Sequence, residues 1–482
     1  MYSEMRLVDE FENVYFSAGE VGRGGQGIVL RTRDSDIAVK LITDELQQPL
    51  ADRAACAAAL ERLRRLRILP VPSDLPLARP VAALRSQAGY VMRLLDAMRS
   101  FKDVFESPGA REQDAALPSW LADVASHDLR AAEQLADYAA TGSTKARLLL
   151  LAKCAVVLAR LHAAGLVYGD LSTSNVFTSG TGTDAQVWLI DADNVHVEGQ
   201  AAGHAFYTEG FGAPELMRGD SGASFRTDCH AFAVAAFNLL CLAHPFVGAQ
   251  ALEGEDWSKP DADPMRQAME GRLPWIHDAD DTSNSTDQGL PPVLTCTPRL
   301  SSLFNECFGP GRSAPWRRPS MLHWPEALAA AADCSVHCAG CDMSYFAIDL
   351  PKCPYCAIAR PLLLRFDSHR WPDLGQPCWT FLLAADGAVD AAQLPARVFL
   401  PFSMAGNDEP LLSVQAEEGG YRLRRVRSSG PPLQIARTGV REGRFEALEN
   451  FHLSEQQLGA GVSIFVPGAQ ARLVRLVVME AV

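Results

Sequence analysis

Lysine is scarce in this sequence, and long hydrophobic segments are absent. Only six of the 44 basic residues are lysines, and the 482-residue chain carries a formal net charge of −14 at pH 7. This negative charge argues against nucleic acid and anionic membranes as partners. No apolar run reaches the ~20 residues that span a bilayer, and the N-terminus lacks the apolar core of a signal peptide. We therefore expect a soluble, cytoplasmic protein that binds neither nucleic acid nor membranes.

The twelve cysteines fall into two groups. Without an export signal, metal binding or free thiols are favoured over disulfides. Five of the cysteines lie between residues 334 and 356. The other seven are scattered, mostly in apolar runs, and are expected in the core: Cys56, Cys154, Cys229, Cys241, Cys296, Cys307 and Cys378.

A glycine-rich turn near the N-terminus has the spacing of a phosphate-binding loop. Gly22, Gly24 and Gly27 with Val29 fit G-x-G-x-x-G-x-V, and Gly25 lies in the same turn. Glycines let the backbone approach phosphate oxygens and donate amide hydrogens to them. A dinucleotide-binding loop opens a helix, whereas here the chain continues as a strand, so a mononucleotide site is favoured. We expect strands over 21–33 and 37–43.

Lys40 lies eleven residues after Val29 in the strand sequence Ile37-Ala-Val-Lys. This pattern is typical of a lysine that contacts the α- and β-phosphates of a nucleotide. The alternative is an ordinary charge on an edge strand.

The segment from Leu161 to Phe177 resembles the catalytic loop of the eukaryotic-like (Hanks-type) protein kinases, whose pattern is H-R-D-L-x-x-x-x-N. The resemblance implies that Asp170 is the catalytic base and that Asn175 ligates magnesium. Asp191, 21 residues after Asp170, would hold the magnesium that bridges the phosphates. It also implies an ion pair between Lys40 and Glu61, in a helix expected over 51–68. A solvated Glu61 is the alternative.

The resemblance extends to about residue 330. It places Thr208 against the catalytic aspartate, pairs Glu215 with Arg318, and lets Asp228 anchor the catalytic loop. It adds Val29, Ala38 and Met92 to the nucleotide-binding residues. It implies ATP and Mg²⁺ as cofactors and a bilobal α+β kinase domain over 1–332, with an N-lobe over about 1–95 and a C-lobe over about 96–332.

Several positions depart from the kinase pattern. Tyr168 and Gly169 replace His and Arg, Ser172 replaces a lysine, and Ala192-Asp193 replaces Phe-Gly. These spellings look like a bacterial subgroup encoded beside a von Willebrand factor A protein and a metal-dependent Ser/Thr phosphatase, in clusters associated with tellurite and other chemical stress. The resemblance implies these two proteins as partners. Two other readings stay open, namely a pseudokinase scaffold and a small-molecule phosphotransferase.

The cysteine-rich segment over 334–357 predicts a zinc ribbon. Cys338, Cys341, Cys353 and Cys356 form two C-x2-C pairs separated by eleven residues. Four thiolates can bind zinc tetrahedrally and leave no open coordination position for catalysis. Redox pairs or free thiols are the alternative.

The segment over 358–482 is expected to form an all-β domain, a sandwich or a barrel used for recognition. It contains 13 arginines, no lysine and 13 acidic residues, so it is not a basic nucleic-acid platform. Its apolar runs are separated by turn residues at the spacing of all-β proteins. Strands are expected at 362–366, 379–383, 398–402, 411–414, 421–426, 462–466 and 473–479.

Overall fold

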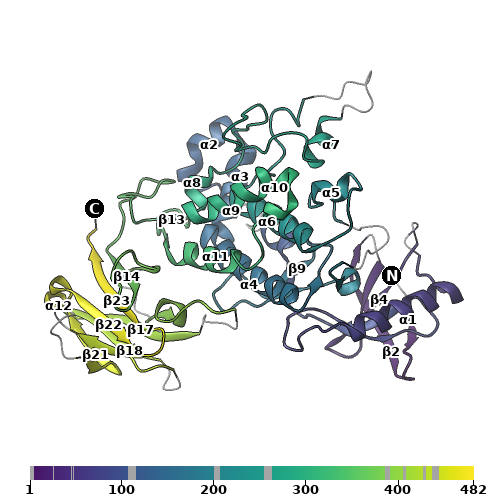
Figure 1. The fold of residues 1–482 in the computed structure, drawn as a ribbon, viewed down its shortest axis with the longest axis horizontal. Coiled ribbons are helices and arrows are strands. Elements are labelled where there is room, and N and C mark those ends of the chain that lie inside the picture. Colours follow the sequence, from purple (N-terminus) through teal and green to yellow (C-terminus); the bar gives the residue numbers. More distant parts are fainter. Residues whose placement is uncertain are drawn as a thin grey trace. The chain divides into compact units, whose positions relative to one another are not determined.

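The protein is described by a computed structural model, which has a mixed α/β fold (Figure 1). Contacts divide the chain into two units. The first comprises Met1–Ser107, Lys153–Gly289 and Ser302–His323, and the second comprises Pro108–Ala152, Leu290–Ser301 and Trp324–Val482. The described residues are 5–24, 27–44, 46, 48–106, 116–199, 207–253, 263–385, 391–404, 409–426, 430–436 and 445–481.

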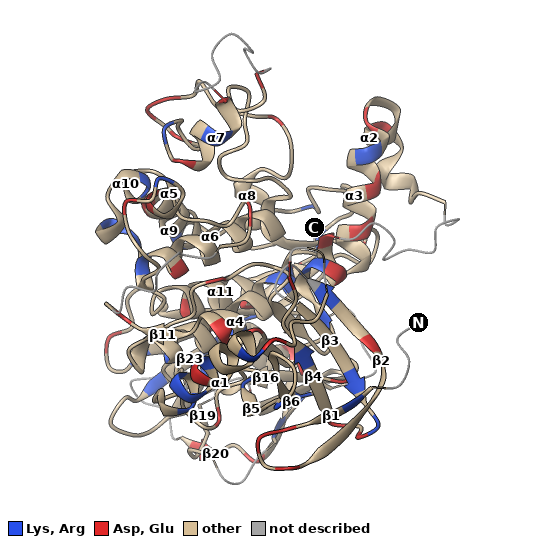
Figure 2. Cartoon of the chain, turned by 90° about the vertical axis from the view of Figure 1, so that its right-hand side faces the viewer, with Lys and Arg blue, Asp and Glu red and all other residues tan. Residues whose placement is uncertain are grey.

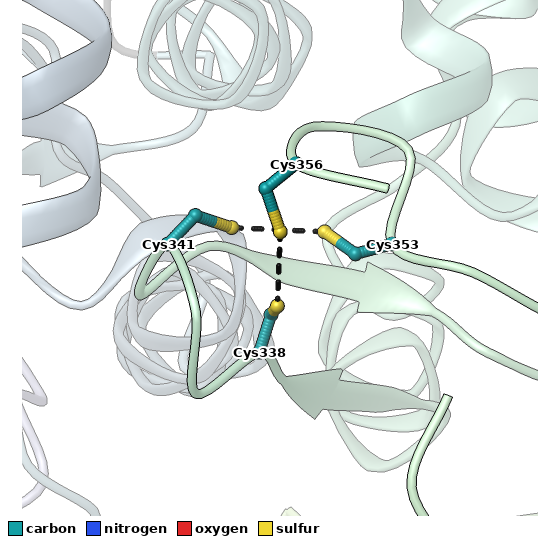
Figure 3. A group of neighbouring side chains, drawn as sticks. All are labelled: Cys338, Cys341, Cys353 and Cys356. Atoms are coloured by element: carbon teal, nitrogen blue, oxygen red, sulfur yellow. Dashed lines mark hydrogen bonds between the residues drawn. The ribbon is translucent and has the colours of Figure 1, made fainter. Parts of the chain in front are cut away.

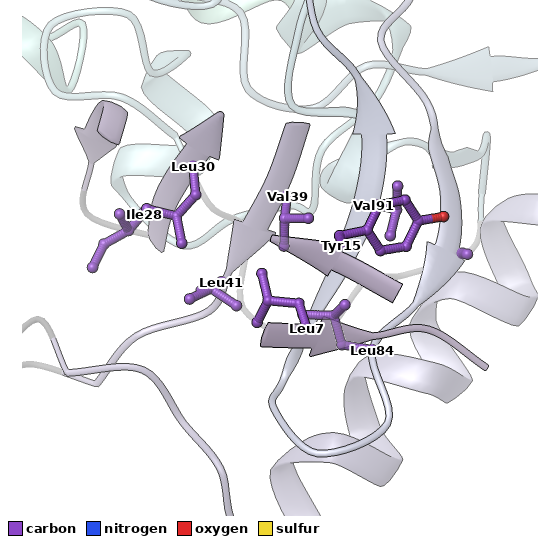
Figure 4. Close-up of a cluster of buried hydrophobic side chains, with 9 residues drawn as sticks. Leu7, Tyr15, Ile28, Leu30, Val39, Leu41, Leu84 and Val91 are labelled. Carbon is purple, nitrogen blue, oxygen red and sulfur yellow. The ribbon is translucent and has the colours of Figure 1, made fainter. Parts of the chain in front are cut away.

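The first unit begins with a six-stranded antiparallel sheet in the order β1-β2-β3-β4-β6-β5. Alternating apolar residues bury one face of this sheet, as Figure 4 shows for Leu7, Ile28, Leu30 and Val39. The strands are β1 (Arg6–Val8), β2 (Val14–Gly24), β3 (Gly27–Thr32), β4 (Ile37–Leu41), β5 (Pro80–Ala83) and β6 (Gly89–Arg93).

The range 21–33, predicted as one strand, contains the end of β2 and the whole of β3. β2 and β3 form a hairpin in which Gly24 pairs with Gly27. Gly27 has a φ of 154°, and a Cβ there would lie 2.2 Å from the carbonyl oxygen of Leu41. Only glycine fits this position. Gly25 lies outside the described residues.

Helix α1 (Arg53–Ile68) follows the predicted range of 51–68 closely, and it begins where Asp52 accepts a hydrogen bond from the amide of Ala55 at 2.9 Å. Leu63 is its one buried residue, so most of the helix is exposed.

The rest of the first unit holds two small sheets and several helices. Helix α6 (Phe225–Cys241) is buried along most of its length and begins with a capping box formed by Ser224 and Thr227. The sheets are β10-β9-β7 and β11-β8. Their strands are β7 (Arg99–Ser100), β8 (Leu166–Val167), β9 (Val176–Thr178), β10 (Val187–Leu189) and β11 (His196–Val197). The other helices are α5 (Pro214–Met217), α7 (Pro264–Met269) and α10 (Pro310–Ser313).

Two helices run from one unit into the other, α4 (Ser143–Ala163) and α9 (Pro298–Phe308). The second unit also contains α2 (Ala122–His127), α3 (Leu129–Ala140), α8 (Pro292–Thr295) and α11 (Trp324–Asp333). A short hairpin of β12 (Ser335–His337) and β13 (Ser344–Phe346) follows α11. This hairpin contacts the start of α4, where the backbone amide of Ser344 donates to the hydroxyl of Ser143 at 2.8 Å.

The C-terminal segment forms two open sheets, in the orders β15-β14-β23-β22-β19-β20 and β16-β17-β18-β21. The described strands therefore form no closed barrel. The first sheet contains β14 (Leu363–Arg370), β15 (Trp379–Ala384), β19 (Gln434–Ala436), β20 (Glu446–Ala447), β22 (Val462–Val466) and β23 (Arg472–Met479). The second contains β16 (Ala392–Pro395), β17 (Pro410–Glu417), β18 (Gly420–Arg425) and β21 (Asn450–Ser454), and α12 (Glu455–Ala460) follows it.

One predicted strand of this segment is wrong. Residues 398–402 form no strand, and Ala396–Val398 form a helical turn instead. The turn directs the buried side chain of Arg397 to Asp333, with hydrogen bonds of 2.7 and 2.8 Å. This polar pairing outweighs the apolar pattern that predicted a strand.

Figure 2 colours the backbone positions of basic and acidic residues, and both kinds are spread along the described chain. The helices that the structure describes include none with the length and apolar character of a membrane span.

Candidate active site

A cavity of about 680 Å³ in the first unit collects most of the predicted nucleotide-binding residues. Its lining includes Gly22, Gly27, Val29, Lys40, Met92, Asp170, Asn175, Asp191 and Thr208. Ala38 is buried in β4, two residues before Lys40 and on the same face of that strand. Gly24 ends β2 at the glycine turn, and Glu61 lies outside the lining.

Lys40 is buried in the floor of this cavity between two carboxylates. Its Nζ donates to Oδ1 of Asp191 at 2.5 Å and to Oδ2 of Asp193 at 3.0 Å. Burial alone would lower the pKa of Lys40, but the charges of Asp193 and Asp191 outweigh it and raise that pKa. The lysine is therefore held as a cation at the cavity.

The two aspartates differ in electrostatic environment. Burial and the neighbouring Asp193 carboxylate raise the pKa of Asp191 to about 6 against the opposing effect of Lys40. For Asp193, the Lys40 and Arg62 charges outweigh burial and lower the pKa. Asp191 also has a left-handed backbone with a φ of 57°, at the start of the turn Ala192–Asn194.

The predicted ion pair between Lys40 and Glu61 is not formed in this structure. Glu61 is exposed and pairs with Arg65 at 3.4 Å. The next residue, Arg62, turns toward the site and donates to the carbonyl oxygen of Asp193 at 2.8 and 3.0 Å. Successive helix residues point about 100° apart, so only one of the two neighbours can face the site. Asp193 takes the place beside Lys40 that was predicted for Glu61.

Asp170 lies at the cavity with both its backbone and its side chain fixed. Its Oδ1 accepts from the hydroxyl of Thr208 at 2.8 Å. The side-chain amide of Asn175 donates through Nδ2 to the Asp170 backbone carbonyl at 2.8 Å and to its carboxylate at 3.4 Å. Burial raises the pKa of Asp170, and the hydrogen bonds from Thr208 and Asn175 oppose this effect. The arrangement can orient an acceptor hydroxyl and receive its proton.

The backbone before Asp170 is anchored by a buried carboxylate of α6. Asp228 accepts from the amides of Tyr168 at 2.7 Å and Gly169 at 2.9 Å, and contacts Nε2 of His162 at 3.0 Å. The hydroxyl of Tyr168 donates to the carbonyl of Ile190, which precedes Asp191. Tyr168 thus links the loop of Asp170 to the loop of Asp191.

Arg318 and Glu215 form a buried bidentate ion pair in the first unit. Arg318 donates to the two carboxylate oxygens of Glu215 at 2.6 and 2.7 Å. The same guanidinium also donates to the carbonyls of Gly311 at 2.8 Å and Arg226 at 3.1 Å. This pairing connects α5 to the turn after α10 and fixes the segment that follows Thr208.

Ser172 does not face the cavity. It is fully buried, and its hydroxyl has no hydrogen-bond partner among the described residues. Cations other than Lys40 do line the cavity, namely Arg23, Arg93 and Arg99.

The second unit contains the four predicted cysteine ligands as one cluster, drawn in Figure 3. The Sγ atoms of Cys338 and Cys356 lie 3.5 Å apart, and those of Cys341 and Cys353 lie 3.6 Å apart. A tetrahedral zinc with bonds of about 2.3 Å requires sulfur separations of about 3.8 Å. The cluster is therefore compatible with a zinc ribbon.

The two cysteine turns have the same backbone geometry. In each, the amide of the first cysteine donates to the carbonyl five residues later, at 2.9 Å in the first turn and 2.8 Å in the second. The residue after the second cysteine has a positive φ in both turns, 58° at Asp342 and 60° at Ala357. This repeated turn points both pairs of thiols to a common centre.

Residues 104–198 match the lipopolysaccharide kinase (Kdo/WaaP) family. The matched segment contains Asp170, Asn175 and Asp191. The chain is kinase-like. A comparison with curated proteins finds no match. The family match supports a phosphotransferase of the kinase type, which uses ATP, and it does not extend to the cysteine cluster or to the C-terminal sheets.

Proposed function

We propose that the protein transfers the γ-phosphate of Mg-ATP to serine or threonine side chains of a partner protein. The observation that carries this proposal is the convergence of Lys40, Asp170, Asn175, Asp191 and Thr208 on one cavity. Phosphoryl transfer needs little covalent chemistry, and it depends on positive charge over the phosphates and an acceptor held in line.

The residues of the site fit a nucleotide and its metal. The cavity of about 680 Å³ lies within the usual size range of small-molecule sites. Asn175 and Asp191 would hold magnesium, since amide and carboxylate oxygens are ligands that this ion prefers. The bound metal would neutralise charge on the phosphates. Lys40 would contact the phosphates, and the glycine hairpin would approach them from above with its backbone amides.

Asp170 would accept the proton of the attacking hydroxyl. Its hydrogen bond to Thr208 orients the carboxylate, and Asp228 holds the loop on which it lies. The pair of Glu215 and Arg318 supports a protein acceptor, because it stabilises the segment after Thr208 on which a polypeptide could lie. We propose the von Willebrand factor A protein and the metal-dependent phosphatase implied by the resemblance as partners in a stress-signalling system.

The match to lipopolysaccharide kinases favours a second candidate, the phosphorylation of a sugar hydroxyl. The same Asp170 could serve a sugar acceptor, because the base acts on a hydroxyl in both reactions. The two candidates differ in the acceptor and not in the nucleotide site.

The test is incubation of the full chain with γ-labelled ATP and Mg²⁺, together with each acceptor class. The acceptors are the chain itself, the two proposed protein partners and purified lipopolysaccharide. Label in phosphoserine or phosphothreonine, absent with Asp170→Asn, supports the protein kinase. Label only in lipopolysaccharide supports the sugar kinase. Nucleotide binding without transfer to any acceptor contradicts both and leaves a scaffold.

A further inference from the structure

A second polar cavity, of about 260 Å³, lies in the second unit beside the C-terminal sheets. Four arginines line it: Arg299, Arg370, Arg397 and Arg472. Glu326 is the one carboxylate in the lining. Such an excess of guanidinium groups is unexpected in a protein with a net charge of −14.

Two of the four arginines are neutralised by carboxylates. Arg299 pairs with Glu326 at 2.6 Å. Arg397 forms a buried ion pair with Asp333 at 2.7 Å. The other two arginines of the lining, Arg370 and Arg472, pair with no carboxylate of the described residues. The cavity therefore has two positive charges that no described carboxylate neutralises.

Arg370 and Arg472 lie directly opposite each other on the neighbouring strands β14 and β23. Like charges at directly opposed positions destabilise a sheet. Arg472 is only 9 % exposed, and the one hydrogen bond of its guanidinium to a described residue is to the sulfur of Cys378. The side chain of Arg370 has no hydrogen-bond or ion-pair partner in the described part of the chain. A buried cation without a counter-charge is costly, and an anion bound between the two guanidinium groups would offset this cost.

The surroundings suit a phosphate attached to a larger group. The ring of Trp379 stacks on Phe402 with centroids 6.0 Å apart, and its Nε1 donates to Asp333 at 2.9 Å, which makes a fixed aromatic wall. Arg370 and Arg472 also line an adjoining cavity of about 390 Å³ beside Trp371. A phosphate between the two arginines could therefore extend into space on both sides.

We propose that Arg370 and Arg472 form a binding site for a phosphate monoester, carried by a phosphorylated serine or threonine side chain of a polypeptide. A phosphate monoester is a dianion near neutral pH and matches the surplus of two positive charges. Guanidinium groups bind phosphate through paired hydrogen bonds, and a peptide on either side of the phosphate would occupy the two cavities. The site is separate from the transfer reaction and needs no nucleotide.

The test measures binding of inorganic phosphate, O-phosphoserine, a phosphoserine peptide and the same peptide unphosphorylated to the full chain, by calorimetry and by the unfolding midpoint. We expect the phosphopeptide to bind at least about tenfold more tightly than inorganic phosphate, and the unphosphorylated peptide not to bind. Arg370→Met and Arg472→Met should each weaken phosphate binding by about tenfold or more, the order of a lost bidentate contact. Arg475→Met is the matched control, because Arg475 lies three residues along β23, outside the lining.

The stability of Arg472→Met without ligand gives an independent result. Removal of an uncompensated buried charge should raise the unfolding midpoint of the free protein and abolish the further rise that phosphate causes in the parent. If Arg472→Met fails to fold, the exposed Arg370→Met still tests the site. Equal binding of phosphate to the parent and to both variants would overturn the proposal, and so would an equal loss in Arg475→Met. Binding of free phosphate with no gain from the peptide would overturn the phosphopeptide assignment. None of these results depends on whether the chain transfers phosphate.

Discussion

Nζ of Lys40 donates to Oδ2 of Asp193 at 3.0 Å, and both side chains are buried. Arg62 of α1 holds the backbone of the same aspartate through its carbonyl oxygen. Asp193 therefore connects the lysine of the sheet to the helix, a role for which the sequence suggested Glu61. Helix α1 is coupled to the site through a guanidinium and a backbone carbonyl, and not through a carboxylate.

This relationship predicts different effects for two charge-removing variants. Asp193→Asn should lower the single-turnover transfer rate by about 10²-fold, because a preorganised charge beside Lys40 is lost. Glu61→Gln should change the rate by no more than about fivefold, because an exposed ion pair contributes only about 0–1 kcal/mol. Rates are measured for both variants with the unfolding midpoint as a control. The reverse order of effects would show that Glu61 replaces Asp193 in the active state.

Substitutions of the two aspartates at the cavity, Asp170 and Asp191, should impair different steps, transfer in one case and Mg-ATP binding in the other. Asp170→Ala should abolish transfer and leave the affinity for Mg-ATP nearly unchanged, because the base contacts the acceptor. Asp191→Ala should weaken the binding of Mg-ATP, because a metal ligand is removed. Calorimetry with and without Mg²⁺ distinguishes the two. An unchanged magnesium dependence in Asp191→Ala would contradict its assignment as a ligand.

Much of this site could be predicted from the sequence because its signals are local. The glycine turn, the spacing from Asp170 to Asn175 and the strand before Asp191 each depend on a few adjacent residues. Adjacent residues do not decide whether Glu61 or Arg62 faces the site, because this depends on how α1 is rotated against the sheet. The replacement of the glycine of the kinase pattern by Asp193 is visible in the sequence. Its ion pair with Lys40 is not, because the two residues lie 153 positions apart and meet only in the folded chain.

The C-terminal segment was harder to predict for a related reason. Strong apolar runs such as β22 and β23 were found, whereas the short polar strands β20 and β21 have no such signal. The exposure of Cys378 was also missed, because the scattered cysteines lie mostly in apolar runs and were all expected in the core. The arginine pair beside this cysteine becomes recognisable only through the register of β14 and β23.

The cysteine cluster predicts a structural metal. Elemental analysis should find about one zinc per chain, since four thiolates complete a tetrahedral site. Cys338→Ser or Cys353→Ser should lower the zinc content and unfold the ribbon locally, while Cys378→Ser, which alters an exposed cysteine outside the cluster, should do neither. A chelator should reproduce the effect of the cluster variants. A natively folded preparation without metal would contradict the prediction.

The burial of Ser172 predicts that a lysine cannot be restored there. Ser172 occupies the position of a lysine in the kinase pattern. The structure places this side chain at 0 % exposure and outside the cavity, so an added ammonium would be buried without a partner. Ser172→Lys should therefore lower the unfolding midpoint, whereas Ser172→Ala should leave it unchanged or raise it, because the hydroxyl has no partner among the described residues. Both midpoints can be measured by thermal unfolding.

The burial of His230 should make the folded protein less stable in mild acid. Its buried ring stacks on Phe246 with centroids 5.7 Å apart and meets Phe308 edge-on at 6.0 Å. Burial, assisted by the charges of Arg318 and His244, holds the pKa of His230 well below its usual value of 6.5. The unfolded chain therefore takes up a proton near pH 6.5 that the folded chain does not, and folding is disfavoured as the pH falls further.

The expected size of this effect is about 1.4 kcal/mol per pH unit below the unfolded pKa, for one proton taken up. His230→Phe keeps an aromatic ring at this position and should flatten the dependence of stability on pH between 6.5 and 5. Phe101→Leu serves as the control, because Phe101 is buried against Phe105 and its truncation removes packing without removing a titrating group, so it should lower stability equally at each pH. Denaturant unfolding of the three proteins across this pH range makes the comparison. An unchanged slope in His230→Phe would show that other buried groups, and not this histidine, cause the acid sensitivity.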